Sequence, residues 1–494
     1  MRSWRTHKSQ RSRCLTWIKQ RCLRSTKRNT TCGRESRRPS VKFEDLNGKV
    51  VTVWGAGREG KAAFQELARR GIAARIAVTG TREVPADEPN VIIGEDASAA
   101  LAASDAIVIS PGIPHTLPEF RALKAAGIAI TSLMDLWLNE HHSRVIGVTG
   151  TKGKSTTASL IAHVLDAVGV PAVVVGNLGV PVTEYAGGDD RVAVVEVSSY
   201  QAADLTISPR IAVVTCLYPE HLTWHGSFEQ YSRDKLNLVA HNPVAVITPS
   251  DDPALASRIE QVITGSTRFS DPADLNITVT PEGILWGTSL LEANQIPLRG
   301  QHNLHNVALA LAAVASFVSL SSEQRALAFD AVASFVPLAH RLETIPTADG
   351  RTWVDDSLAT APEAVVAALE TFAGQPVTLI AGGEDRHVPW TPLIDYLKVR
   401  PDSAQVRVAA VGPAGARLAG ELGPTGAAVE VCSNFAAALA YASEKTDSPV
   451  IVLSPGAPSF DEFASYEERS AAFRAFAQSQ LAQSRFAQSR EVAP

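Results

Sequence analysis

The feature that most constrains this 494-residue chain is a glycine-rich turn between an apolar run and a helix-forming segment. Val145-Ile146-Gly147-Val148 is typical of a buried strand, residues 149–156 (TGTKGKST) of a turn, and the stretch up to Asp166 of a helix. Small residues in such a turn let backbone N–H groups face an anion, and the helix N-terminus adds its positive end. The segment therefore predicts a phosphate-binding loop, in which Lys154 reaches a β- or γ-phosphate.

This loop departs from the common G-x4-G-K-[ST] pattern. From Gly147 the spacing to Gly153 is one residue too long, and from Val148 the spacing fits but the first glycine is missing. The physical requirements remain, because a strand still ends in small residues before a helix. The alternative is an ordinary glycine turn in front of a helix.

The rest of the chain alternates strands with helices, which predicts an α/β protein with parallel sheets in three units. In the first unit, a strand at 50–54 leads through residues 55–60 (GAGREG) into a helix at 61–70, and a second strand covers 106–110. Strands at 172–175, 193–197 and 211–215 follow the phosphate loop. The third unit shows strands at 377–381, 406–411 and 450–453. The simplest division places the units at 43–140, 141–337 and 338–494.

Residues 1–42 form a basic tail of different composition. Positions 1–40 hold 13 lysines and arginines and a single acid, Glu35, although the whole chain has a net charge of −5. The tail could be a nucleic-acid-binding arm, an organelle transit peptide, or a disordered segment or mis-assigned start with the true start near Val41. We favour the last interpretation. The acidic remainder of the chain argues against a nucleic-acid partner.

Cysteine use and hydropathy also bound the class of protein. Beyond the tail the chain keeps only Cys216 and Cys432, so we expect no disulfide framework and a reducing, cytoplasmic environment. No apolar run of the length that spans a bilayer is present, so no membrane insertion is expected.

Residues 150–156 (GTKGKST) resemble the loop of the Mur ligases and the folylpolyglutamate synthases, and other motifs recur in that family's order. They are 176–179 (GNLG), 196–201 (EVSSYQ), 219–222 (PEHL), Tyr231-x3-Lys235, 300–306 (GQHNLHN), His340-Arg341, Asp356-Ser357 and 453–457 (LSPGA). The resemblance covers nearly everything except the tail. It implies a Rossmann-like UDP-substrate-binding domain at 43–140, a central P-loop ATPase domain at 141–337 and a C-terminal Rossmann-like amino-acid-binding domain at 338–494.

The reaction implied by the resemblance activates a carboxylate as an acyl phosphate, which an amine then attacks. Phosphoryl transfer between anions depends on cations and positioning. The expected cofactors are ATP and Mg²⁺, and the expected catalytic groups are Lys154, Glu196, His221 and Lys235. The residues expected to contact ATP are Gly150, Thr151, Lys152, Gly153, Lys154, Ser155, Thr156, Asn303, Asn306, Arg341 and Asp356.

Magnesium ligands are expected from four residues. Glu196 ends a predicted buried strand, so its carboxylate can sit over the phosphates, and Ser155 would complete the metal shell. The resemblance implies that His221 is a metal ligand or positions the acyl phosphate, and that Lys235 is carbamylated and so becomes an anion. Taken alone, these could be a strand-end acid facing solvent, a structural histidine and a solvated helix lysine.

The turn at 55–60 matches G-x-G-x-x-G, which suggests a nicotinamide site. The second strand, however, ends in Ile76-Ala77-Val78-Thr79-Gly80 without the acid that such a site requires. The alternative is a loop for the UDP of a nucleotide sugar, as in the glutamate-adding members of the family, which act on UDP-N-acetylmuramoyl-L-alanine. The residues expected to contact that substrate are Arg58, Ser110, Pro111, Gly112, Asn177, Ser198 and Gln201.

The incoming glutamate is expected at Thr360, Arg386, Ser459 and Tyr466. Here the chain departs from members that use D-glutamate, with Leu358 in place of a lysine and Arg386 after the double glycine. A branch that uses L-glutamate is similar at 151–157, 219–227, 382–386 and 454–460, so we favour L-glutamate over D-glutamate. Remoter alternatives are a folylpolyglutamate-type ligase and a P-loop kinase or switch. We expect a monomer.

Overall fold

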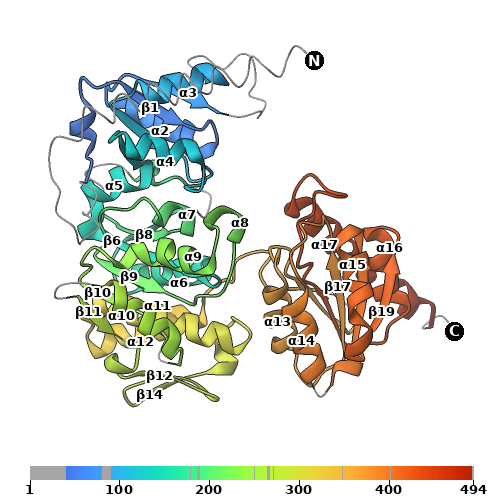
Figure 1. The fold of residues 1–494 in the computed structure, drawn as a ribbon. Coiled ribbons are helices and arrows are strands. Elements are labelled where there is room, and N and C mark those ends of the chain that lie inside the picture. The colour runs from blue at the N-terminus through green and yellow to red at the C-terminus, as the bar shows by residue number, and fades with distance from the viewer. Residues whose placement is uncertain are drawn as a thin grey trace, which may run out of the picture. The chain divides into compact units, whose positions relative to one another are not determined.

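A computed structural model describes residues 40–79, 91–177, 180–185, 190–249, 251–263, 267–270, 272–347, 349–400 and 402–491, the last twelve without side chains. The predictions for residues 1–39 lie outside this range. The described chain forms two compact units, one up to Glu292 together with His305–Ala333, and the other made of Ala293–Leu304 and the residues from Ser334 onward. Figure 1 shows the elements of each unit.

The first sheet of unit 1 is parallel, in the order β3-β2-β1-β4-β5. Its strands and helices are β1 (Val51–Trp54), α2 (Arg58–Arg69), β2 (Ala74–Val78), β3 (Val91–Ile93), α3 (Glu95–Ala102), β4 (Ala106–Ile109), α4 (Pro118–Ala125), β5 (Ala129–Ser132) and α5 (Leu133–His141). Successive strand residues point to opposite faces. Val53 therefore joins the core under α2 and α5, whereas Trp54 joins the core under α3 and α4.

The second sheet of unit 1 is also parallel, in the order β11-β10-β9-β6-β8-β7. Its strands are β6 (Val145–Thr149), β7 (Ala172–Gly176), β8 (Val192–Glu196), β9 (Ile211–Val214), β10 (Ala245–Ile247) and β11 (Arg268–Ser270). The associated helices are α6 (Lys154–Ala167), α7 (Ser199–Ala202), α8 (Leu222–His225), α9 (Phe228–Leu236), α10 (Pro253–Val262), α11 (Gln301–Phe317) and α12 (Ser322–Ala333). The strand β6, which precedes the predicted phosphate loop, is central and lies between β8 and β9.

A small antiparallel sheet follows the second sheet and was not anticipated from the sequence. It is formed by β12 (Ile277–Thr280), β13 (Gly283–Trp286) and β14 (Ser289–Glu292). Trp286 and Ile284 of its middle strand are buried.

Unit 2 contains one mixed sheet in the order β15-β16-β20-β17-β18-β19, in which only the β15–β16 pair is antiparallel. Its elements are β15 (Glu343–Ile345), β16 (Thr352–Asp355), α13 (Pro362–Thr371), β17 (Val377–Gly382), α14 (Thr391–Val399), β18 (Val406–Val411), α15 (Gly412–Leu422), β19 (Ala428–Cys432), α16 (Phe435–Glu444), β20 (Val450–Leu453) and α17 (Tyr466–Glu491). Leu379 packs with α13, α14 and α15 on one face, and Ile380 packs with α16 and α17 on the other. Helices therefore cover both faces of this sheet (Figure 1).

Membrane-spanning helices and disulfide bonds can be examined in the described residues. Their helices include none that is both long and apolar enough to cross a membrane. Within the same residues, Cys216 and Cys432 form no disulfide.

Candidate active site

The predicted phosphate loop lies between β6 and α6, at the carboxyl edge of the central parallel sheet. Gly150 and Gly153 have φ values of 148° and 81°, which a residue with a side chain rarely adopts. A Cβ atom at Gly150 would lie 1.9 Å from Thr215 Oγ1, and one at Gly153 would lie 2.5 Å from Asn306 Oδ1. The helix α6 begins at Lys154 without a side-chain cap. The strand–turn–helix prediction is confirmed, and both glycines are sterically required.

Two lysines converge on one carbonyl group of this loop. Lys154 Nζ donates to Gly150 O at 2.9 Å and to Thr151 O at 3.1 Å, and Lys235 Nζ from α9 donates to the same Gly150 O at 2.9 Å. Burial is the main cause that lowers the pKa of Lys154, and the charge of Glu196 opposes it. The second lysine comes from a helix that is distant in sequence, because Lys235 lies 85 residues from Gly150. The two cations concentrate positive charge where a polyphosphate would lie.

Lys235 is not the solvated surface lysine that it could have been. Only 2% of it is exposed, and its ammonium group lies 5.0 Å from the centre of the Tyr231 ring. Burial, with the nearby Lys154 charge, holds the pKa of Lys235 well below its ordinary value. A neutral amine is therefore accessible at a lower pH than for an exposed lysine. An unprotonated amine is the form that can react with an electrophile such as carbon dioxide.

Glu196 ends β8 beside the loop and is 3% exposed. Its Oε1 atom accepts a hydrogen bond from Asn177 Nδ2 at 2.9 Å. Its Oε2 atom has no hydrogen-bond partner among the described residues. A buried carboxylate oxygen is stabilised by a polar or cationic partner, so this oxygen is available as a metal ligand.

The residues of the Pro-Glu-His-Leu motif lie next to the loop. Lys152 Nζ forms an ion pair with Glu220 Oε1 at 2.8 Å, and His221 Nε2 lies 3.7 Å from Glu220 Oε2. Burial alone would raise the pKa of Glu220, but Lys152 and His221 outweigh it and lower that pKa. Burial lowers the pKa of His221 more than the Glu220 charge raises it, so the neutral imidazole is favoured. Its ring centre is 4.9 Å from that of Tyr200.

Three other residues expected at the nucleotide have structural partners. The Thr151 hydroxyl lies 2.8 Å from Tyr231 Oη and anchors α9 to the loop. Asn306 Oδ1 accepts from Thr157 Oγ1 at 3.3 Å, which places α11 against α6. Asn303, on the first turn of α11, donates to Arg299 O at 2.7 Å. Ser155 and Thr156 are buried in the first turn of α6.

The expected contacts of the UDP substrate fall into two groups. Arg58 and Gln201 line one pocket, together with Glu59, Leu133, Met134 and Gly176. Gln201 Nε2 donates to Glu59 Oε1 at 2.6 Å, and its Oε1 accepts from the Ser198 backbone and hydroxyl. Burial raises the pKa of Glu59.

Ser110, Pro111 and Gly112 form the second group, in the turn directly after β4. Ser110 Oγ donates to Gly55 O at 3.3 Å. A Cβ atom at Gly60 would lie 2.0 Å from Gly55 O, so the G-x-G-x-x-G turn packs tightly against the start of α2. None of these three residues lines the pocket at Arg58 and Gln201.

Unit 2 brings Asp356 and the backbone around Arg341 together. Asp356 accepts from Ser454 Oγ at 2.8 Å and from the Leu342 backbone N–H at 3.3 Å. Burial raises the pKa of Asp356 to about 7, and the charge of Arg341 opposes the shift. His340 and Leu342, on either side of Arg341, have φ values of 63° and 49°. Strain of this kind persists where surrounding contacts fix the backbone.

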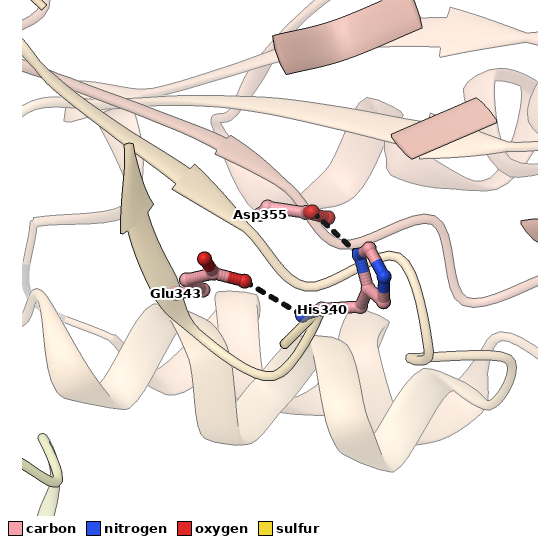
Figure 2. Close-up of side chains that lie close together, drawn as sticks. All are labelled: His340, Glu343 and Asp355. Atoms are coloured by element: carbon pink, nitrogen blue, oxygen red, sulfur yellow. Dashed lines mark hydrogen bonds and ion pairs between the residues drawn. The ribbon is translucent and has the colours of Figure 1, made fainter. Parts of the chain in front are cut away.

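Those contacts form a cluster at the amino end of unit 2. Figure 2 shows His340, Glu343 and Asp355, whose potential ligand atoms lie within 4.8 Å of one another. His340 Nδ1 is 2.9 Å from Asp355 Oδ2, and the His340 backbone N–H donates to Glu343. The guanidinium of Arg474 contacts both carboxylates. A cation is thus already present, and we interpret the cluster as an ion-pair network that holds His340.

The four residues expected at glutamate lie in different local environments within unit 2. Arg386 forms an ion pair with Glu384 at 3.0 Å and lies 5.8 Å from the centre of the Phe460 ring. Ser459 is 2% exposed, and its hydroxyl has no hydrogen-bond partner among the described residues. Thr360 is exposed, and the Tyr466 ring centre is 5.7 Å from that of His340.

Only some of the side chains around the phosphate loop are of the chemical type that holds a magnesium ion. Glu196 offers an unpartnered carboxylate oxygen, Ser155 a hydroxyl at the helix start, and His221 a neutral ring. Oxygen donors are those that Mg²⁺ prefers. Lys235 fits only as an anion, because its amine donates to Gly150 O.

Several residues of this site were not predicted from the sequence. Glu220 stood in a recognised motif, yet only the adjacent histidine was selected. Glu59 in unit 1 and Arg474 in unit 2 gave no sequence signal, because Glu59 contacts Gln201 across 142 residues and Arg474 contacts Asp355 across 119 residues. The usable signal for Glu220 was an acid beside the motif histidine, in the loop that follows the buried strand β9.

Comparison with known proteins identifies the family of the whole chain. The chain matches the Mur ligase MurD-like N-terminal domain at residues 49–132, the Mur ligase middle domain at 148–314 and the Mur ligase glutamate ligase domain at 340–457. It is 41% identical over 448 residues to a UDP-N-acetylmuramoyl-L-alanine–L-glutamate ligase from a Micromonospora species, covering 88% of this chain and 97% of that protein. A protein of the same name from Xanthomonas axonopodis pv. citri is 35% identical over 459 residues, with coverage of 88% and 96%.

Solved structures show the same fold at low identity. MurF from Acinetobacter baumannii has a TM-score of 0.54 and 18% identity, covering 86% of this chain and 89% of its own. MurF ligase from Thermotoga maritima, in complex with ADP, has a TM-score of 0.52 and 17% identity, with coverage of 91% and 100%. The chain therefore belongs to the Mur ligase family and is an ATP-dependent ligase that forms amide bonds.

Proposed function

We propose that this enzyme joins L-glutamate to UDP-N-acetylmuramoyl-L-alanine at the expense of ATP, in the synthesis of peptidoglycan precursors. The observation that carries the proposal is the convergence of Lys154, Lys235 and the unpartnered Glu196 carboxylate on one glycine loop. The substrates follow from relatives that are 34–41% identical and are named as L-glutamate ligases.

In the proposed reaction, an oxygen of the alanine carboxylate attacks the γ-phosphorus of ATP and ADP leaves. The glutamate amine then forms the new C–N bond, loses a proton, and phosphate leaves as the C–O bond breaks. Lys154 binds the phosphoryl group that moves, and the uncapped start of α6 faces it. In this proposal His221 would accept a hydrogen bond or a proton near the reacting carboxylate, which its lowered pKa supports.

Magnesium belongs to the same proposal. Ser155, Glu196 and His221 would hold it, with Lys235 if its amine carries a carbamate. The ion would supply positive charge to the phosphate oxygens. The lowered pKa of Lys235 supports the carbamate, because only the neutral amine adds to carbon dioxide. The proposal also assigns four residues to ATP, because the chain resembles the Mur ligases at these positions: Asn303, Asn306, Arg341 and Asp356.

The acceptor sites are assigned by unit. The first sheet of unit 1 is Rossmann-like in our proposal and binds the UDP group through Arg58 and the 110–112 turn, with Asn177, Ser198 and Gln201 toward the muramoyl end. Unit 2, also Rossmann-like, holds glutamate at Thr360, Arg386, Ser459 and Tyr466. The division at 43–140, 141–337 and 338–494, a cytoplasmic location and a monomeric state complete the assignment.

The choice of L- over D-glutamate rests on the binding groups of unit 2. Leu358 replaces a lysine, and Arg386 offers a planar guanidinium that fixes a carboxylate in two directions. The ordinary D-glutamate ligase remains the alternative. A folylpolyglutamate-type ligase is disfavoured by the match to a Mur ligase N-terminal domain at residues 49–132.

The test is phosphate release from ATP with UDP-N-acetylmuramoyl-L-alanine and either enantiomer of glutamate. We expect L-glutamate to react at least about tenfold faster in kcat/KM, which is about 1.4 kcal/mol of transition-state binding. Faster reaction of D-glutamate would identify the D-glutamate ligase. Phosphate release that needs no UDP substrate would instead contradict the assignment of the first sheet.

A further inference from the structure

A chain of three buried side chains lies beside the proposed metal site and has no assigned role. His225, the last residue of α8, places Nε2 3.0 Å from Ser199 Oγ and Nδ1 2.7 Å from Asp234 Oδ2. The other oxygen of Asp234 accepts from Gln230 Nε2 at 2.7 Å. The three residues come from α7, α8 and α9, so the chain connects three helices.

The hydrogen bonds define the arrangement of protons. A carboxylate only accepts, so Nδ1 of His225 carries the proton that is donated to Asp234. In a neutral ring, Nε2 then accepts from the hydroxyl of Ser199. The ring stacks on Tyr200 with a centre distance of 5.5 Å and meets the edge of Tyr231 at 5.2 Å. His225 is therefore held in one orientation by two hydrogen bonds and two aromatic rings.

A serine, a histidine and an aspartate linked in this order also form the catalytic triad of many hydrolases. The burial of these three residues excludes that chemistry here. Ser199 is 2% exposed and the side chain of His225 is fully buried. A nucleophile must reach its substrate, and this hydroxyl faces only the protein interior. The hydrogen bonds instead hold together the three helices that carry these residues.

Its two ends adjoin the two groups proposed as metal-binding anions. Ser199 starts α7, three residues after Glu196 at the end of β8. Asp234 directly precedes Lys235 on α9. The same helix also contacts the phosphate loop through Tyr231 and Thr151. Any shift of α9 relative to α7 would change the separation between Glu196 and Lys235.

We propose that His225 is a positioning residue, which with Ser199 and Asp234 fixes the spacing of Glu196 and Lys235 for a divalent cation. The inference rests on the proposed function, because it takes both residues as metal-binding groups. It adds a role for the Trp224-His225-Gly226 segment that the reaction itself does not use.

Two variants divide the chain at its centre. His225→Asn places an amide near Nδ1 and keeps the bond to Asp234, whereas His225→Gln reaches the position of Nε2 and keeps the bond to Ser199. The readout is Mn²⁺ affinity in the presence of ADP, measured by the electron paramagnetic resonance signal of the free ion. We expect each variant to bind Mn²⁺ about tenfold more weakly, the lower end of the effect of removing a direct partner of a metal ligand, because His225 acts through Ser199 and Asp234. kcat should fall while the KM for glutamate stays unchanged.

The matched control is Ser232→Ala on α9, the helix that carries Asp234 and Lys235. Ser232 is as buried as Ser199, but its hydroxyl bonds to Phe228 O within α9. Ser199→Ala should weaken Mn²⁺ binding, whereas Ser232→Ala should not. The double variant Ser199→Ala with His225→Asn should lose no more Mn²⁺ affinity than either single variant, because both changes remove the same hydrogen bond between Ser199 and His225.

Wild-type Mn²⁺ affinity and kcat in both folded His225 variants would overturn the proposal. If these variants melt below the assay temperature, Ser199→Ala decides, and equal Mn²⁺ affinity for Ser199→Ala and Ser232→Ala would overturn it. Failure of the proposed function gives a different result: the wild-type enzyme would bind Mn²⁺ normally without joining glutamate to the UDP substrate.

Discussion

The carbonyl of Gly150 is the acceptor that Lys154 and Lys235 share, so under the proposed function the backbone at this residue should control activity. Substituting alanine adds a Cβ atom at a φ of 148°, 1.9 Å from Thr215 Oγ1 and 3.1 Å from the Cys216 backbone nitrogen. Either the loop or the Thr215 side chain must therefore move. Gly150→Ala is therefore a test of whether the position of one carbonyl group organises the site.

The magnitude can be built from two terms. A side chain at positive φ costs about 1–3 kcal/mol. Displacing the Thr215 hydroxyl from its bonds to Thr149 O and Lys152 O costs a further ~1–3 kcal/mol. Gly169→Ala is the matched control, because Gly169 has a φ of 85° but open space around its Cβ position. Only the first term applies to it.

The assays are thermal melting and phosphate release. Gly150→Ala should lower Tm by roughly twice as much as Gly169→Ala, at about 2–4 °C for each kcal/mol. Its turnover should fall by about 10²-fold, since a displacement of the order of 1 Å at a catalytic group has that effect. Turnover of Gly150→Ala within about threefold of Gly169→Ala would refute the reasoning that the shared carbonyl positions both lysines.

Four other changes test separate parts of the site. Lys154→Ala should reduce phosphate release by about 10²–10³-fold with little change in Tm, and near-wild-type release would contradict the phosphate-loop assignment. Lys235→Arg keeps a cation but cannot form a carbamate, so it should be inactive; the ¹³C carbamate signal of wild-type enzyme in labelled bicarbonate should be absent from the variant. Arg386→Lys should raise the KM for glutamate well before that for ATP, and an unchanged KM for glutamate would remove Arg386 from the amino-acid site. Burial raises the pKa of Asp356 to about 7 in the folded protein, against an ordinary 3.8. Between these values the folded protein keeps a proton that the unfolded chain has lost, so stability falls as pH rises. Asp356→Asn should flatten the fall in Tm between pH 5 and about pH 7.5, and an equally steep fall in the variant would show that another group causes it.

Local patterns in the sequence were sufficient for the central strands of the three large sheets, whereas most of the edge strands and the small antiparallel sheet were not predicted. The β-branched runs at 106–110, 211–215 and 450–453 became strands within one residue of their expected ends. The turn at 149–154 was predicted because a strand, small residues and a helix start follow one another directly. Each of these signals lies within a few residues of chain.

Contacts between distant segments could not be predicted in this way. Lys235 could have been any helix lysine, and its burial depends on Gly150, which is 85 residues away. Arg474 meets Asp355 across 119 residues, and the pattern around α17 gave no sign of it. The assignments of Asn303 and Arg386 came from resemblance alone, and the structure gives them partners within the protein.

The lowered pKa of Lys154 has a consequence for nucleotide binding. A polyphosphate placed in the loop supplies negative charge that reverses the shift, so the bound enzyme holds the lysine proton more tightly than the free enzyme does. Proton uptake and ligand uptake then become thermodynamically linked, as they are for any site whose pKa changes on binding. Between the two pKa values of Lys154, the affinity for nucleotide rises as the solution becomes more acidic. A diphosphate, with fewer phosphate charges, would reverse less of the shift, so under the proposed function protonation of Lys154 would contribute more to the binding of a triphosphate than of a diphosphate.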